Sequence, residues 1–205
     1  MFGRSNKDKS SSPSNRWLIV GLGNPGAEYE KTRHNIGVML TTHLASSNGA
    51  RFSSHKARAH VAEFRMGVGT DVPSLVVAQL HCYMNESGGP TKALADFYKI
   101  AGDHIIVAHD ELDIPFQAIR VKFGGGDNGH NGLKSITSAL GTADYFRLRL
   151  GIGRPPGEQN PADFVLKPFS STERKTMEEF LIIGEQAVES LVRYGLEKTQ
   201  QNFNK

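Results

Sequence analysis

Short apolar runs alternate along this chain with longer segments in which apolar residues recur at helical spacing. The short runs predict strands at residues 18–22, 75–80, 105–108, 118–123 and 147–152. The longer segments predict helices at residues 36–44, 90–98, 131–140 and 171–193. This alternation is typical of an α/β domain, with a largely parallel sheet between layers of helices.

Particular residue types mark the ends of these predicted helices. Pro90 suits the first position of a helix, and Asn131 suits a cap. Glycines predict helix ends near residues 49, 141 and 195.

The chain has 205 residues, which corresponds to one domain of ordinary size. Residues 1–16 are polar and contain no apolar segment, so we expect a flexible tail and not a secretory signal. The domain itself is expected over residues 17–205. A single cysteine, Cys82, excludes an internal disulfide and is consistent with a cytoplasmic location. No apolar run approaches the roughly 20 residues of a membrane span, so we expect no membrane association.

The formal charge of +3 is small, but the basic residues are clustered. Between Glu30 and Glu63 there is no acidic residue, whereas residues 115–154 contain six basic and two acidic ones. Clustered cations favour a polyanionic partner such as nucleic acid. Solvated surface charge explains the same composition equally well.

Residues 21–26, GLGNPG, follow the first predicted strand and match the G-x-G-x-x-G pattern of dinucleotide-binding proteins. Such a site also needs an acidic residue about twenty positions later, and none lies between Glu30 and Glu63. We therefore expect a tight turn that presents Asn24 beyond the strand. A nucleotide-cofactor enzyme remains the alternative.

Three polar residues follow the ends of predicted strands: Asn24, Asn85 and Asp110. Each alone is most simply a turn or cap residue. Ligands of open α/β sheets bind outside the carboxyl ends of the strands, so together these three residues predict one crevice.

His34 precedes the first predicted helix and is the natural general base at neutral pH, although a lone histidine there is more often a surface residue. Asp110 would orient its ring and stabilise the imidazolium, as the acid of a hydrolase triad does. No G-x-S-x-G nucleophile accompanies them, and Cys82 lies in a strand-like run. Water is therefore the expected nucleophile.

Residues 124–132 contain five glycines, which allow a ligand to approach the backbone closely. The G-K-[ST] ending of a phosphate-binding P-loop is absent. The embedded His130 and Asn131 and the flanking Lys122 favour a binding role over a merely flexible loop. A zinc site is the alternative for His34, His109, His130 and Asp110, but no zinc-binding spacing is present and we favour a metal-free site.

Five segments closely resemble bacterial peptidyl-tRNA hydrolases: LIVGLGNPGAEYEKTRHNIG (18–37), MNESG (84–88), VAHDELDIPFQAIRVKFGGG (107–126), GHNGLKSI (129–136) and FRLRLGIGRP (146–155). The resemblance covers nearly the whole chain from Trp17. It implies a single compact α/β domain with a twisted mixed sheet, and an enzyme that cleaves the ester between peptide and tRNA and so recycles tRNA during translation. It also implies a cytoplasmic monomer that works without metal, cofactor or obligate protein partner.

The resemblance assigns roles by position. His34 becomes the catalytic base and Asp110 its partner. The residues that bind the peptide, the ester or the attacking water are Asn24, Tyr29, Asn85, His130 and Asn131. Lys122 and Arg149 match the basic pair that holds the 5′-phosphate of tRNA, which agrees with the clustered charge.

The chain departs from the usual family pattern at Asp127-Asn128 in the glycine-rich loop and at residues 81–83. An acidic residue at position 127 is expected to weaken the approach of an anionic substrate. A related branch of the family assists intron splicing by binding RNA without catalysis, and this branch is the alternative function.

Overall fold

A seven-stranded sheet lies at the centre of the computed structural model, which describes residues 15–69, 72–155 and 157–205. The strands are β1 (Arg16–Gly21), β2 (Ser53–His55), β3 (Ala59–Arg65), β4 (Ser74–Leu80), β5 (Ile105–Glu111), β6 (Ile119–Phe123) and β7 (Phe146–Gly151). Their order across the sheet is β2-β3-β4-β1-β5-β7-β6. The four central strands β4, β1, β5 and β7 are parallel, and β3 and β6 flank them in antiparallel pairing. The predicted α/β fold with a largely parallel, mixed sheet is confirmed.

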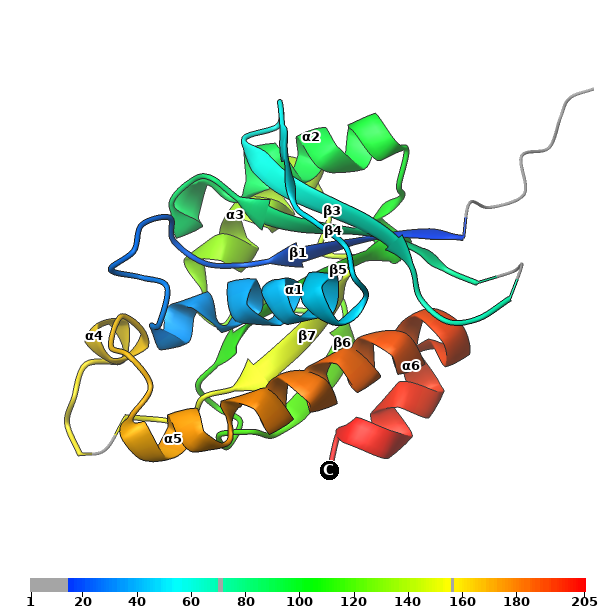
Figure 1. The fold of residues 1–205 in the computed structure, drawn as a ribbon. Coiled ribbons are helices and arrows are strands. Elements are labelled where there is room, and N and C mark those ends of the chain that lie inside the picture. The colour runs from blue at the N-terminus through cyan, green and yellow to red at the C-terminus, as the bar shows by residue number, and fades with distance from the viewer. Residues whose placement is uncertain (1–14, 70–71, 156) are drawn as a thin grey trace, which may run out of the picture.

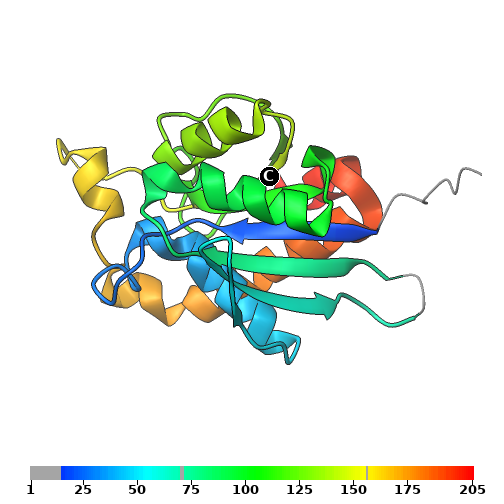
Figure 2. The same cartoon turned by 90° about the horizontal axis from the view of Figure 1, so that it is seen from above.

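Helices cover both faces of this sheet (Figure 1). They are α1 (Ile36–Ser47), α2 (Gly88–Tyr98), α3 (Asn131–Leu140), α4 (Pro161–Val165), α5 (Ser171–Lys175) and α6 (Met177–Phe203), with short 3₁₀ turns η1 (Arg33–Asn35), η2 (Met84–Glu86) and η3 (Gly102–His104). The helices α2 and α3 pack on one face, towards the viewer in Figure 2, and α1 and α6 pack on the other.

Strand β1 shows how the sequence builds this three-layer arrangement. Leu18 and Val20 belong to the core between the sheet and α2 and α3, whereas Ile19 belongs to the core that includes α1 and α6. All three side chains are fully buried. A strand that is apolar at every position, with side chains alternating between two faces, needs a helical layer on each side.

Two glycines bring α1 close to the carboxyl ends of β1 and β5. A Cβ atom on Gly37 would lie 2.3 Å from the carbonyl oxygen of Ala108, and one on Gly21 would lie 2.3 Å from the carbonyl oxygen of Gly37. Only residues without a side chain allow this approach. As a result, the turn η1 before α1 lies beside the end of β5.

Several predicted helix ends need correction. Pro90 is the third residue of α2, not the first. Asn131 is the first residue of α3, and the side chain of His130 is the cap. The long C-terminal segment is divided between α5 and α6. The predicted interruption near Gly195 is present, because Gly195 is non-helical at φ 79° and separates two helical parts of α6.

The segment after this interruption continues to Phe203 because it covers the edge strand β6. Asn204 Oδ1 accepts a hydrogen bond from the backbone N–H of Val121 at 2.7 Å, and Gln200 Nε2 donates to the Val121 carbonyl at 2.9 Å. These side chains satisfy backbone groups that an edge strand otherwise leaves unpaired. The sequence pattern did not predict this segment, the strands β2 and β3, or α4. Cys82 lies beyond β4, not within a strand, and is buried.

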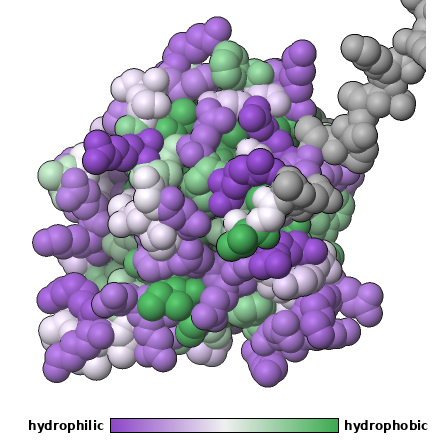
Figure 3. All heavy atoms as spheres, turned by 45° about the vertical axis from the view of Figure 1, so that its right-hand side comes forward, coloured by the Kyte–Doolittle hydropathy of each residue, from purple (hydrophilic) through white to green (hydrophobic). Residues whose placement is uncertain are grey.

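The predicted tail, residues 1–16, falls mostly on residues 1–14, which lie outside the described part of the chain. Arg16 already belongs to β1. Within the described ranges, no helix combines the length and apolar character needed to cross a lipid bilayer. The face of the molecule in Figure 3 is mostly hydrophilic, with hydrophobic side chains in small separate groups.

Candidate active site

The carboxyl ends of β1, β4 and β5 lie side by side in the sheet and carry three of the predicted site residues. Asn24 follows β1, Asn85 lies in η2 after β4, and Asp110 is near the end of β5. Asn24 Oδ1 accepts a hydrogen bond of 2.8 Å from the backbone N–H of Met84, the residue before Asn85. The structure therefore brings the predicted residues to one edge, where the chain order across the sheet changes direction around β1.

Asn35 holds Asn24 in place, and the sequence analysis did not single it out. Asn35 Oδ1 accepts a hydrogen bond from the backbone N–H of Asn24, and Asn35 Nδ2 donates to the Asn24 carbonyl, both at 2.9 Å. An asparagine just before a helix is most simply a cap. Here its buried side chain instead fixes the backbone of a turn eleven residues earlier.

Asp110 accepts hydrogen bonds from two histidines on one oxygen. His34 Nδ1 lies 2.8 Å and His130 Nε2 lies 3.1 Å from Asp110 Oδ1. Burial alone would raise the pKa of this carboxyl, but the two imidazoles outweigh burial and hold the pKa well below its ordinary value. Asp110 is therefore ionised at neutral pH. An ionised carboxylate only accepts hydrogen bonds, so both facing nitrogens carry hydrogen.

Arg33 anchors the turn that carries His34. Its buried guanidinium donates to the carbonyls of Lys167 at 3.2 Å and Pro168 at 2.8 Å, and it pairs with Glu173 at 2.8 Å. This arginine of the basic stretch 31–58 therefore serves the fold and is not available for an anionic ligand.

His109 lies between the Asp110 cluster and a small hollow. Its ring centroid is 5.0 Å from that of His130, and its Nδ1 donates to the carbonyl of Asp110 at 2.8 Å. Its buried Nε2 has no hydrogen-bond partner within the described residues. Burial is the main cause that lowers the pKa of His109 to about 3, so this imidazole is neutral.

The hollow beside His109 also contains the two predicted phosphate-binding residues. Its lining consists of His109, Glu111, Lys122, Gly126, Asn128, Leu133, Arg147 and Arg149. Arg149 Nε donates to Glu111 Oε2 at 3.0 Å, and this pair is largely buried. Lys122 is exposed and takes part in no ion pair with another described residue.

Arg147 shares a face of β7 with Arg149 but has a different role. It is 2% exposed, and its Nη1 donates to the carbonyls of Gly124 at 2.7 Å and Gly126 at 2.8 Å. Arg147 therefore holds the glycine-rich loop. Gly125 has a φ of 102°, a backbone conformation that residues with a Cβ atom rarely adopt, so glycine is favoured there.

The residues Asp127 and Asn128 shape the turn at the end of this loop. Asp127 Oδ1 accepts a hydrogen bond of 2.9 Å from the backbone N–H of Gly129, and Asn128 adopts the left-handed conformation at φ 49°. Asp and Asn are favoured in such turns. The Asp127 carboxylate thus stabilises the turn, and it keeps its negative charge.

Asn131 and Tyr29 are placed less tightly than the other predicted residues. Asn131 is the exposed first residue of α3, directly after His130, and Tyr29 is half-buried in the turn that leads to His34. Within the described residues, neither side chain forms a hydrogen bond. Both are free to contact a ligand.

Three of the four residues of the alternative zinc site lie together in the structure. His34, Asp110 and His130 are the one group in the described part of the chain with three potential ligand atoms within 4.8 Å of one another, and His109 is not part of it. The imidazole nitrogens that face Asp110 carry hydrogen and have no lone pair to offer. The geometry therefore fits a hydrogen-bonded cluster better than a metal site.

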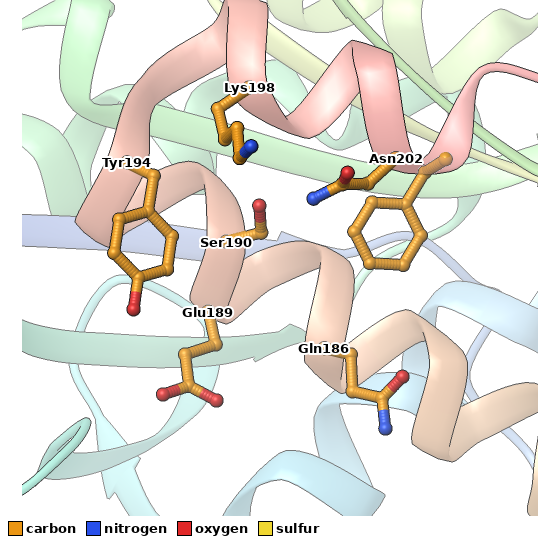
Figure 4. A pocket seen from close by; sticks show the side chains of 7 residues that line it. Gln186, Glu189, Ser190, Tyr194, Lys198 and Asn202 are labelled. Atoms are coloured by element: carbon orange, nitrogen blue, oxygen red, sulfur yellow. The ribbon is translucent and has the colours of Figure 1, made fainter.

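A larger cavity of about 270 Å³ lies between the two limbs of α6 (Figure 4). Its lining residues are Gln186, Glu189, Ser190, Tyr194, Lys198, Asn202 and Phe203. None of the predicted site residues lines it. The cluster at the strand ends is therefore the candidate active site.

Comparison with known proteins gives a consistent result. The sequence model of the family described as peptidyl-tRNA hydrolase matches residues 18–205. A peptidyl-tRNA hydrolase of Kineococcus radiotolerans is 53% identical over 194 residues, which cover 93% of this chain and 98% of that protein. One of Streptomyces coelicolor is 54% identical over 190 residues, which cover 92% of this chain and 94% of that protein.

Solved structures agree with the sequence comparisons. The crystal structure of peptidyl-tRNA hydrolase from Acinetobacter baumannii superposes with a TM-score of 0.82 at 34% identity, covering 94% of this chain and 96% of that one. Sequence and fold thus match over almost the full length of both proteins, and the chain belongs to the peptidyl-tRNA hydrolase family.

Proposed function

We propose that this chain hydrolyses the ester that joins a peptide to the 3′ end of tRNA and so recycles tRNA during translation. The observation that carries this proposal is the hydrogen bond between His34 Nδ1 and the buried carboxylate of Asp110, at the edge where Asn24 and Asn85 also lie. Release of tRNA from an N-blocked aminoacyl-tRNA by the purified protein tests it. The alternative of a non-catalytic RNA-binding relative is not supported, because the similar proteins over nearly the whole chain bear the hydrolase name.

In the proposed reaction, His34 keeps its proton on Nδ1, which donates to Asp110. Its other nitrogen, Nε2, has a free lone pair. Nε2 takes a proton from water, and the oxygen of that water attacks the ester carbonyl. The tetrahedral intermediate then collapses, and the proton on His34 passes to the departing 3′ oxygen of the ribose. The products are tRNA with its hydroxyl restored and a peptide carboxylic acid, which releases its proton to solvent and becomes a carboxylate.

Asn24 is the best-placed donor for the substrate. Its side-chain oxygen already accepts from Met84, so the amide Nδ2 points its hydrogens elsewhere and has no partner within the described residues. We assign this N–H group, with Asn85 and Asn131, to the ester and peptide backbone, and Tyr29 to the lining. Backbone recognition suits an enzyme that must accept many peptide sequences.

Lys122 and Arg149 are assigned to a terminal phosphate of tRNA. Lys122→Ala should raise KM for a tRNA substrate and reduce the slope of log KM against log salt by about one phosphate contact, because an exposed ammonium contributes through counterion release. On a short substrate without the 5′-phosphate, turnover and KM should stay close to the wild-type values. The measurement is hydrolysis of both substrates over a range of salt concentrations.

Lys175→Ala is the matched control, since it removes one exposed cation from α5, which contains none of the predicted site residues. It should change neither substrate's kinetics. Lys122 is a cleaner probe than Arg149, because Arg149→Ala also removes the ion-pair partner of the buried Glu111. Equal losses on both substrates in Lys122→Ala would assign Lys122 to the catalytic crevice or the fold.

We expect EDTA to leave hydrolysis unchanged. Both imidazole nitrogens that face Asp110 are needed as hydrogen-bond donors, so the proposed chemistry uses no cation. The measurement is activity after dialysis against EDTA, in a buffer that keeps the tRNA folded with Mg²⁺ restored before the assay. Inactivation that only zinc reverses would establish the metal alternative.

The proposed setting follows from the substrate. Peptidyl-tRNA arises during translation, so we assign the protein to the cytoplasm, with tRNA binding largely independent of tRNA sequence. We further propose a monomer, as the resemblance to the family implies. Light scattering of the purified protein tests this last assignment.

A further inference from the structure

Both ring nitrogens of His130 are already engaged. Its Nδ1 accepts hydrogen bonds from the backbone N–H groups of Gly132 at 3.1 Å and Leu133 at 3.4 Å, at the beginning of α3. Its Nε2 faces Asp110 Oδ1 at 3.1 Å. An atom that accepts from N–H groups needs a lone pair, so the hydrogen of this imidazole is on Nε2. The start of α3 therefore fixes one tautomer of His130.

Protonation of Nδ1 would break the same contact. A hydrogen on Nδ1 would point at two backbone N–H groups, and the helix N-terminus carries positive partial charge. Charged groups elsewhere around α3 are compensated: Lys92 pairs with Asp96 on α2, and Glu86 on η2 pairs with Arg58. The nearby titratable groups are Asp110 and His109 from β5, His34 from η1, and Asp127 and Lys134 beside His130 in sequence.

His109 is kept neutral by a different cause. It is buried, its Nδ1 donates to a backbone carbonyl, and its pKa is lowered to about 3. Three imidazoles thus surround Asp110, with ring centroids of His130 5.0 Å from those of both His34 and His109. Of these three imidazoles, only that of His34 has a nitrogen, Nε2, that makes no hydrogen bond and can be reached by water.

We propose that His130 is a positioning residue for hydrolysis: locked by α3 as a neutral Nε2–H donor, it shares the Asp110 oxygen with His34 and leaves His34 as the only imidazole that can accept the proton of water. The inference rests on the proposed role of His34 as base. The Nε2–H group of His130 holds the Asp110 carboxylate in place. It also weakens the electrostatic effect of that carboxylate on His34.

Two substitutions separate the two contacts of His130. Asn is a good helix cap, so His130→Asn retains an oxygen for the N–H groups of α3, but its side chain is too short to reach Asp110. His130→Ala removes both contacts. In His130→Asn the Asp110 carboxylate would stabilise protonated His34 more strongly, so the acid limb of the pH–rate profile should move to higher pH by about half a unit to one unit. Turnover at neutral pH should fall about 3- to 10-fold with KM unchanged.

The direct test is nitrogen-15 NMR of wild-type protein labelled at histidine. The spectra are recorded from about pH 5 to about pH 8, the range in which free histidine titrates. We expect His130 to show the neutral Nε2–H pattern and His109 the neutral Nδ1–H pattern throughout. A doubly protonated His130 in this range would overturn the proposal, even if no variant folds.

The kinetic outcomes decide the remaining point. A wild-type pH profile in His130→Asn with a defect only in His130→Ala would reduce His130 to a helix cap. A change confined to KM would make it a substrate contact. Failure of the proposed function would appear differently, as no release of tRNA by the wild-type protein, and failure of the proposed base would appear as near-normal turnover in His34→Ala. Neither would change the NMR pattern of His130.

Discussion

Replacement of His34 by alanine should lower kcat by about 10²- to 10⁴-fold, the usual contribution of a positioned general base. Folding should be retained, because the His34 side chain makes its described hydrogen bond to Asp110 alone and Arg33 anchors the turn independently. Affinity for deacylated tRNA should stay close to the wild-type value, since the assigned phosphate contacts lie on β6 and β7. Single-turnover hydrolysis and fluorescence anisotropy measure the two effects separately.

His43→Ala is the matched control for this variant. His43 lies on α1 and pairs with Glu185, and Ser47 and Asn48 also donate to the same Glu185 carboxylate. Its removal takes away one histidine of the same region without orphaning a charge, so kcat should change little. Turnover near the wild-type level in His34→Ala would refute the proposed mechanism.

The sequence predicted the interior of the sheet better than its edges, for a physical reason. Central strands such as β1 and β5 are buried on both faces and therefore contain continuous apolar runs, at residues 17–20 and 105–108. The edge strand β2, SSH, is short and exposed, so no apolar pattern distinguishes it from a loop. The helical part after Gly195 was not predicted, because it is held by contacts with β6, which lies far away in the sequence.

Helix caps were predicted from residue type, and at α3 the context decided otherwise. Asn131 has the higher cap preference, but the imidazole of His130 receives the backbone N–H groups while its other nitrogen binds Asp110. A local preference cannot anticipate this result, because the contact that favours His130 comes from a residue twenty positions away in sequence.

The sequence predicted which residues would lie near one another in the candidate site, but it did not predict all of the contacts between them. His34 and Asp110 were paired by chemistry, since a base needs an oriented partner, and the structure brings their atoms to 2.8 Å across 76 positions of sequence. The difference between Arg147 and Arg149 was not predictable, because both share one face of an alternating strand. Only the position of the glycine-rich loop shows that Arg147 binds its carbonyls.

Asp110→Asn should reduce kcat by about 10²- to 10⁴-fold, with a much smaller change in KM. The asparagine oxygen can still accept from both His34 and His130, so the geometry is retained, but the negative charge that stabilises the imidazolium is lost. The acid limb of the pH–rate profile should move to lower pH, because His34 then holds its proton less strongly. This shift is opposite in sign to the one expected for His130→Asn.

Asp113→Asn provides the control, since it removes an exposed carboxylate three positions further along that pairs only with Arg154 among the described residues. This control should change neither the acid limb of the pH–rate profile nor the maximal kcat.

Thermal stability gives a second measurement. Burial raises the pKa of Asp110, but the two imidazoles lower it more strongly. The ionised carboxylate therefore stabilises the fold at neutral pH, and this contribution is lost as the pH falls. Asp110→Asn should therefore melt at lower temperature than wild type at pH 7, with a smaller difference in acid. A defect confined to KM, with the acid limb unmoved, would instead place Asp110 on the substrate-binding surface and leave His34 without its partner.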